Sequence, residues 1–170
     1  MLFRSAHESI GNFNKAEECL RQALLISDNP MVKNYLGYSL LKNGKNTEEA
    51  FQLIVDAYNL APDDGSIIDS LGWALYQFGM YEKAISYLEQ ASDASPSEAV
   101  IYDHLGDAYW DIGRKYEAVY QWNHAIKLKD SSGELDREKV LKKINNGKLK
   151  HTPLTLDKDK LEKIITSIKE

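Results

Sequence analysis

Three stretches of the sequence share one form: NYLGYSLLKNG at 34–44, DSLGWALYQFG at 69–79 and DHLGDAYWDIG at 103–113. Their Leu-Gly pairs follow one another at intervals of 35 and 34 residues. A glycine inside a helical apolar pattern costs about 1 kcal/mol relative to alanine, so its return at one place needs a structural reason. The recurrence indicates that the chain is built from copies of one unit.

Other small residues return at an interval of 34. They form two alanine series and a pair of prolines: Ala16, Ala50, Ala84 and Ala118; Ala23, Ala57, Ala91 and Ala125; Pro62 and Pro96. Each unit predicts two helices. In the unit that starts near Gly65, one apolar stripe ends at Gly79, and a second runs from Tyr81 to Ala91. No useful length of sequence alternates as a strand would, so we expect an all-α fold.

The series of Leu-Gly, glycine, alanine, bulky residue, alanine and proline at this period resembles the tetratricopeptide repeat. The resemblance implies an α-solenoid, a right-handed superhelix of stacked antiparallel helix pairs. We expect about three full repeats, a partial N-terminal one and C-terminal capping helices. The expected divisions are a degenerate repeat at 1–29, repeats at 30–64, 65–98 and 99–132, a capping helix at 133–147 and a basic linker with a short helix at 148–170. The expected inner face of the capping helix is Leu135, Val140, Leu141 and Ile144.

Within that family, the strings NYLGYSL, PDDGSIIDSLGWALY, IYDHLGDAYW and QWNHA are similar to those of bacterial multi-repeat proteins. Some members of that group are exported or lipid-anchored scaffolds that hold envelope enzymes such as proteases. The resemblance therefore implies a bacterial scaffold or adaptor protein.

Charge is distributed unevenly along the chain. The net charge is −5, but residues 134–170 hold 10 lysines and arginines against 7 acids. The acidic body argues against nucleic acid as a partner. No apolar run has the roughly 18 residues that a membrane span needs. The start lacks the features of a signal peptide, which favours a cytoplasmic location; a fragment of a longer exported protein would be periplasmic or envelope-associated.

The sequence does not predict an enzyme. Cys19 is the single cysteine, so neither an internal disulfide nor a thiolate metal cluster is expected. The histidines at positions 7, 104, 124 and 151 lie far apart, and no nucleophile motif or phosphate-binding loop is present. Carboxylates at 103, 107 and 111 extend over two helical turns and could not all reach one metal ion. We therefore expect no catalytic residue, no cofactor and no metal site.

The resemblance implies that the first helices of the repeats line a concave groove. By the family pattern, the groove residues are Asn34, Tyr38, Leu41, Lys42, Asp69, Trp73, Tyr76, Gln77, Asp103, Asp107, Trp110 and Asp111. We expect Tyr38, Trp73 and Asp107 to form one row across the groove, and Asn34, Asp69 and Asp103 another.

Two interpretations of these residues remain open. The aromatic side chains either anchor a ligand or pack the seams between repeats. The aspartates either form a solvated face or select a cationic peptide. An acidic groove would repel the acidic C-termini of heat-shock chaperones, which some repeats of this family bind, so we expect no binding of that ligand.

The first hypothesis is therefore a non-catalytic protein–protein interaction scaffold, whose acidic, aromatic-lined groove binds a partner segment with basic and apolar residues. A second is a self-associating structural module, in which the basic tail with Lys158, Lys160 and Lys163 lies in the groove of its own chain or of a neighbour. A third is a regulatory region of a larger envelope or enzyme-containing protein.

Overall fold

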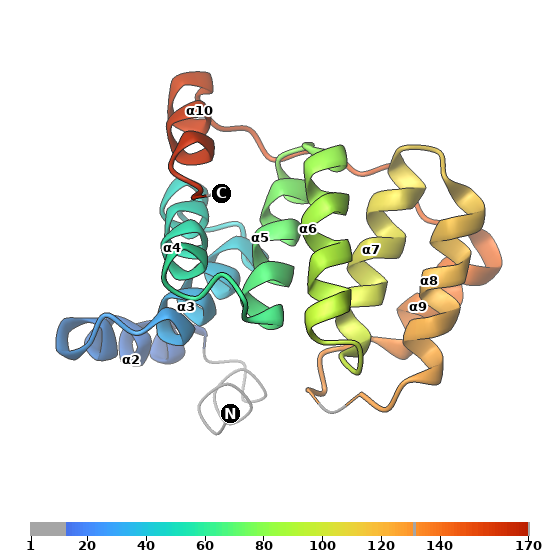
Figure 1. Cartoon of the computed structure of the whole chain (residues 1–170), viewed down its shortest axis with the longest axis horizontal. Coiled ribbons are helices and arrows are strands. Elements are labelled where there is room, and N and C mark those ends of the chain that lie inside the picture. The colour runs from blue at the N-terminus through green and yellow to red at the C-terminus, as the bar shows by residue number, and fades with distance from the viewer. Residues whose placement is uncertain (1–12, 131, 170) are drawn as a thin grey trace. The chain divides into compact units, whose positions relative to one another are not determined.

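The computed structural model describes residues 13–130 and 132–169, and all regular structure within them is helical. The helices are α2 (Phe13–Ile26), α3 (Pro30–Lys42), α4 (Thr47–Leu60), α5 (Gly65–Gln77), α6 (Tyr81–Ala94), α7 (Ala99–Asp111), α8 (Lys115–Lys127), α9 (Arg137–Asn146) and α10 (Lys158–Thr166) (Figure 1). The predicted all-α fold is confirmed. Residues 1–12, with His7 and the expected first helix of the degenerate repeat, lie outside the described residues.

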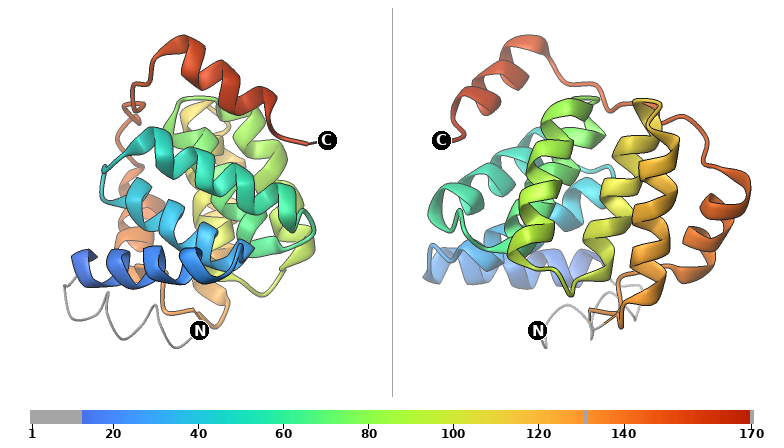
Figure 2. Two further views of the ribbon diagram at one scale, coloured as in Figure 1. Left: turned by 90° about the vertical axis from the view of Figure 1, so that its left-hand side faces the viewer. Right: turned by 45° about the vertical axis from the view of Figure 1, so that its right-hand side comes forward.

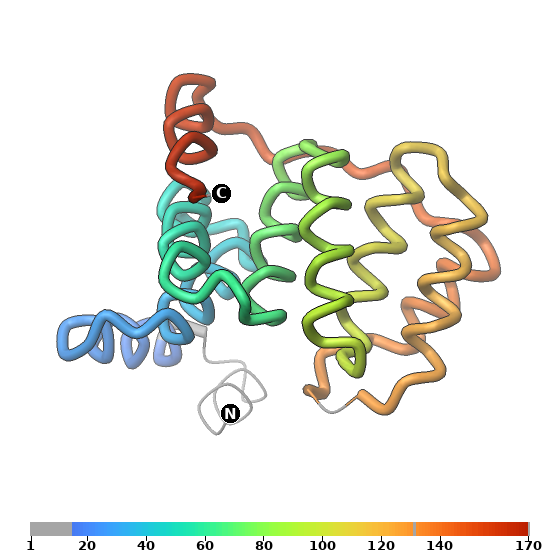
Figure 3. Tube along the Cα trace, viewed as in Figure 1, coloured from blue at the N-terminus to red at the C-terminus, as the bar shows by residue number. Residues whose placement is uncertain are grey.

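The chain divides into two compact units. One consists of the residues up to Pro62 and those from Leu156 onwards, and the other is Asp63–Thr155. In the first unit, α3 packs against α2 and α4, and α10 lies on α4 (Figure 3). The Asn59 side chain on α4 donates a hydrogen bond to the carbonyl of Ser167 and accepts one from the amide of Lys169, which holds the end of α10 in place.

The second unit carries two complete helix pairs. α5 pairs with α6 and α7 with α8, while α7 also packs on α5 and α6, and α9 closes the series against α8 (Figure 1). This arrangement of stacked antiparallel pairs is that of an α-solenoid.

The recurring Leu-Gly pair, called the Leu-Gly joint below, lies where the two helices of each pair approach most closely. Leu71 and Leu105 are buried. A Cβ atom on Gly72 would lie 2.7 Å from Cγ of Leu88, and one on Gly106 would lie 2.4 Å from the Trp122 indole. Both distances are too short for real Cβ contacts, so the second helix of the pair can approach this closely only because the first helix has glycine there. This close approach explains the glycine inside a helix.

Local sequence signals set the helix ends. Side chains of Asn29, Asp64 and Asp157 accept hydrogen bonds from the first free amides of α3, α5 and α10, as N-cap residues do. Gly79 and Gly113 follow α5 and α7 with φ of 77° and 87°, a left-handed conformation that glycine adopts without strain.

The capping helix forms, but with a different inner face from the one predicted. Val140 and Leu135 are buried, as expected. Leu141, predicted to face inward, is 46% exposed, and the prediction for this residue is wrong. Lys143 faces inward instead, because acidic side chains of α7 stabilise its charge there, as described below. Among the described residues, no helix is long and apolar enough to cross a membrane.

Candidate functional site

Eight of the predicted groove residues lie together on two helices of the second unit. Asp69, Trp73, Tyr76 and Gln77 are on α5, and Asp103, Asp107, Trp110 and Asp111 are on α7. We call the surface formed by these eight residues the α5–α7 face. The remaining four predicted residues are on α3 in the first unit, where Asn34, Tyr38 and Leu41 are buried and Lys42 is exposed.

Asp69 is paired with a histidine of the next first helix. Its Oδ1 atom lies 2.9 Å from Nδ1 of His104, and both side chains are buried. Burial alone would lower the pKa of His104, but the charge and hydrogen bond of Asp69 outweigh it and raise that pKa. The Trp73 ring stacks on the His104 ring at a centroid distance of 4.0 Å. Asp69 and Trp73 thus both contact the seam between α5 and α7.

Asp103 and Asp107 share one lysine. Nζ of Lys143, on α9, lies 2.8 Å from Oδ1 of Asp103 and 2.7 Å from Oδ1 of Asp107. The Trp122 indole donates a second hydrogen bond to Asp107 at 3.1 Å. Burial would lower the pKa of Lys143, but the two carboxylates outweigh it and raise that pKa, so the ammonium form is favoured.

Asp111 binds the chain that follows α9. Its Oδ2 atom lies 2.5 Å from Nζ of Lys148 and accepts a hydrogen bond of 2.8 Å from the Tyr76 hydroxyl. Its Oδ1 atom accepts a hydrogen bond of 3.2 Å from the backbone amide of His151. Burial would raise the pKa of Asp111, but these donors outweigh it and lower that pKa, which keeps the carboxylate charged.

Residues 148–154, which we call the docked segment, cross the C-terminal ends of α7 and then α5 (Figure 2). The Trp110 indole donates a hydrogen bond of 2.9 Å to the carbonyl of Lys148. The amide of Leu154 donates one of 2.7 Å to the carbonyl of Gln77. Between these points the His151 ring stacks on Tyr76, with centroids 4.4 Å apart.

Rings from three elements form one continuous stack through the face. Tyr76 lies between His151 and Trp73, and its ring centroid is 4.8 Å from that of Trp73. Trp73 in turn covers His104. Tyr76 is only 1% exposed, since its ring packs against Trp73, Tyr81 and the His151 ring of the docked segment. The aromatic residues of the face are therefore packed both at the seam between the helices and against the docked segment.

Sequence reasoning missed the groups that meet the acids of the α5–α7 face. These are Lys143, Lys148, His104, the Trp122 indole and the amide of His151. The excess positive charge of the tail was the available signal, but the lysines named for this contact were 158, 160 and 163. Lys160 pairs instead with Glu48 of α4 at 2.7 Å, since α10 packs on that helix.

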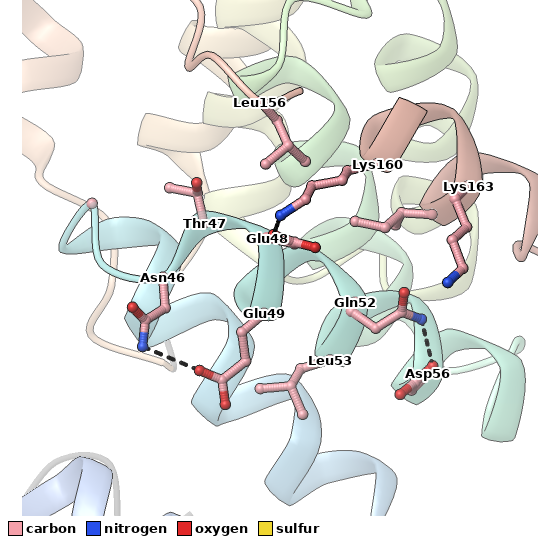
Figure 4. A pocket seen from close by; sticks show the side chains of 12 residues that line it. Asn46, Thr47, Glu48, Glu49, Gln52, Leu53, Asp56, Leu156, Lys160 and Lys163 are labelled. Carbon is pink, nitrogen blue, oxygen red and sulfur yellow. Dashed lines mark hydrogen bonds and ion pairs between the residues drawn. The ribbon is translucent and has the colours of Figure 1, made fainter. Parts of the chain in front are cut away.

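A hollow of about 910 Å³ lies in the first unit between α4 and α10 (Figure 4). Its side chains bond to one another: Lys160 to Glu48, and Gln52 to Asp56 at 2.9 Å. The hollow lacks the buried aromatic rings that the α5–α7 face has, so it is the weaker candidate for a binding site. In the described part of the chain, no group of three or more acidic, histidine or cysteine side chains is placed to hold a metal ion.

The sequence profile of the tetratricopeptide repeat matches residues 5–64 and 70–132. The chain belongs to the tetratricopeptide repeat family. Proteins of this fold are typically interaction modules, and the fold suggests a protein–protein interaction scaffold that binds another protein or peptide.

Known proteins with repeats of this kind resemble parts of the chain. A TPR repeat-containing protein of Pseudomonas aeruginosa is 45% identical over 64 residues, which are 38% of this chain and 11% of that protein. The chain thus matches only a small part of that relative. MamA from Desulfovibrio magneticus RS-1 has a TM-score of 0.60 at 19% identity, over 98% of this chain and 89% of that one. YrrB, described as a TPR protein with an unusual peptide-binding site, has a TM-score of 0.60 at 20% identity, over 79% of this chain and 67% of that one. At these identities, the structural likeness shows the fold alone.

Proposed function

We propose that the protein is a non-catalytic scaffold and that its α5–α7 face binds an extended segment of a partner protein that carries basic and apolar residues. One observation carries this proposal: the face already holds an extended stretch of polypeptide, through main-chain hydrogen bonds at Lys148, His151 and Leu154. Main-chain contacts of this kind suit any extended chain, while the Asp111 carboxylate and the Tyr76 ring would select its side chains.

Of the four aspartates on the face, Asp111 is the one that an incoming cation can reach at acceptable cost. Lys143 lies inside α9, and removing it would leave two carboxylates without their buried partner, which costs about 3–5 kcal/mol. Lys148 lies outside any helix, so it can leave by local opening of the docked segment. The selectivity for positive charge is therefore assigned to Asp111.

The apolar part of the partner has a platform in Tyr76 and Trp110. The Tyr76 ring stacks on His151. The six-membered ring of Trp110 packs on Gly147 so closely that a Cβ atom there would lie 2.5 Å from the ring. Rigid aromatic rings beside fixed polar groups are common anchors for peptides. The peptide-binding site described for YrrB, which has the same fold, supports the proposal by analogy.

A second candidate function is self-association. The docked segment is part of this chain, so the same contacts formed with a second copy would link two molecules by exchange of the tail.

In either case the repeats at 30–64, 65–98 and 99–132 are proposed as one scaffold region of a larger protein, since the Pseudomonas relative is far longer than the matched part.

Fluorescence anisotropy with labelled heptapeptides tests the proposed function. One set carries two lysines and two apolar residues in varied positions, and a matched set carries glutamate in place of lysine. We expect the lysine set alone to bind. Binding should be lost in Asp111→Lys, because the charge on the face is reversed, and kept in Asp63→Lys, which makes the same change at an exposed loop residue.

Equal binding of the two peptide sets, or lysine peptides that bind Asp111→Lys as well as wild type, would show that the face is not the site. Sedimentation of the same samples distinguishes self-association. A dimer that dissociates in Asp111→Lys supports exchange of the tail, and a monomer at all concentrations rejects it.

A further inference from the structure

The main chain of the docked segment forms a hydrogen bond to the α5–α7 face at every third residue. The carbonyl of Lys148 and the amides of His151 and Leu154 form the three main-chain hydrogen bonds. Three residues per turn is the period of the extended polyproline II helix, which has no internal hydrogen bonds of its own. A peptide in that conformation turns residues 148, 151 and 154 to one side, and Pro153 favours it. The main-chain contacts of the face are therefore spaced to suit an extended chain.

The side chains with which the segment meets the helices are chemically specific. Lys148 forms the ion pair with Asp111, whose side chain is only 1% exposed once the segment is in place. The His151 ring covers Tyr76. Pro153 lies against Gly79, where a Cβ atom would be 2.9 Å from Cγ of the proline, so the glycine leaves the space that the proline fills. The pattern is a lysine, a planar ring three residues later and a proline two residues after the ring.

The two residues between Lys148 and His151 face away from the helices. Leu149 is 93% exposed, and Lys150 is exposed as well. The segment thus buries no large aliphatic side chain. Its hold on the helices rests on one ion pair, contacts of the His151 ring with Tyr76 and Tyr81, and five hydrogen bonds of 2.7–3.4 Å. Interactions of this number and type are weak enough for the segment to open locally.

The segment nevertheless competes strongly, because it directly follows α9, which ends at Asn146 and keeps it beside the face. A binding sequence on such a short tether has an effective concentration in the millimolar range. A free peptide of equal intrinsic affinity therefore binds only the fraction of molecules in which the segment has left.

We propose that the docked segment is a built-in competitor for the α5–α7 face. The partner is an extended peptide with the same pattern, a lysine, a histidine or aromatic ring three residues later and a proline two residues after that. This inference rests on the proposed function, and it adds the identity of the peptide and the means by which the site is kept closed.

The test uses a labelled peptide with the sequence of residues 148–154, KLKHTPL, added to the full chain. The released variant carries Lys148→Ala and His151→Ala, which remove the ion pair and the ring contact. A matched control carries Leu149→Ala and Lys150→Ala, two changes in the same segment at exposed side chains. We expect the peptide to bind the released variant about tenfold or more tightly than wild type, and the control to bind like wild type. A peptide with glutamate at its first position should bind none of them.

If the peptide binds wild type, control and released variant with equal affinity, the docked segment is not a competitor, but the face remains a peptide-binding site. If KLKHTPL binds no form but the lysine heptapeptides above do, the proposed pattern is wrong and the proposed function stands. If neither binds, both fail.

A second measurement does not depend on the released variant. In wild type, saturating KLKHTPL should accelerate hydrogen exchange at the amides of His151 and Leu154, which donate to the face. Unchanged exchange in the presence of bound peptide would overturn the proposal.

Discussion

Nζ of Lys143 and Oδ1 of Asp107 lie 2.7 Å apart, with side chains that are 6% and 8% exposed. The two residues come from α9 and α7. Their contact, with Asp103 as the second acceptor, fixes the last helix of the second unit on the preceding repeat by a buried charge. This pair is part of the fold, in contrast to the pair of Lys148 and Asp111, which closes the proposed binding site.

Replacement of Lys143 by methionine should therefore destabilise the protein. The methionine fills a similar volume but leaves Asp103 and Asp107 without their cation, at a cost of about 3–5 kcal/mol in the free energy of unfolding. Urea unfolding followed by circular dichroism measures this loss. The control is Lys142→Met on the exposed side of α9, which should change stability by no more than about 0.5 kcal/mol. Similar losses in the two variants would contradict the buried role of Lys143.

The ion pair between His104 and Asp69 should make stability depend on pH. The folded-state pKa of His104 is raised above the unfolded-state pKa of about 6.5. The ion pair therefore stabilises the fold fully below pH 6.5, and this stabilisation is lost as the pH rises through the folded-state pKa. The free energy of unfolding should thus decrease from pH 6 to pH 9 in wild type. The decrease should be smaller in Asp69→Asn, since the charge that raises the pKa is gone. Identical slopes in wild type and Asp69→Asn would disprove the coupling.

Acid should release the docked segment. The pKa of His151 is lowered by its partial burial and by the charge of Lys148, so docking weakens as the pH falls below about 6.5, where the undocked ring is protonated. The pKa of Asp111 is also lowered in the docked state, so its contribution is present above about pH 3.9 and is lost as the pH falls below that value.

The indole proton of Trp110, which donates to Lys148, reports this release in an NMR titration from pH 7.5 to pH 3. In wild type the signal should move in two steps. In His151→Phe, which keeps a ring on Tyr76 but cannot titrate, only the lower step should remain. Persistence of the upper step in that variant would assign it to another group.

The Leu-Gly joint should not tolerate alanine. A Cβ atom on Gly37 would lie 2.8 Å from the backbone carbonyl of Ala50, which cannot move without shifting α4. We expect Gly37→Ala to lose about 2 kcal/mol in thermal or urea unfolding, although alanine is the better helix former by about 1 kcal/mol. Ser86→Ala, at an exposed position of α6, should be neutral or slightly stabilising. A Gly37→Ala protein as stable as wild type would show that the close approach is not required.

The helices and their pairing could be predicted because their causes are local and repeated. Helices α3, α5 and α7 begin at Pro30, Gly65 and Ala99. Gly79 and Gly113 follow α5 and α7 in a left-handed conformation that is local to their own backbone. The recurring leucines and alanines are buried because helical spacing places them on one side. Eight of the twelve predicted groove residues lie together on α5 and α7 for the same reason, since equivalent positions of adjacent repeats become neighbours.

What meets those residues could not be predicted from the repeats. Lys143, Lys148 and His151 belong to the C-terminal part of the chain, which has no counterpart one period earlier. The capping helix shows the limit: its apolar pattern predicted Leu141 inside, but Lys143 faces inward because two carboxylates of α7 stabilise its charge. The sequence by itself thus determined the repeats, the joint and the residues on the face. Tertiary structure alone decided which cations neutralise the acids, because an ion pair between residues 36 or 37 positions apart depends on the path of the chain through space.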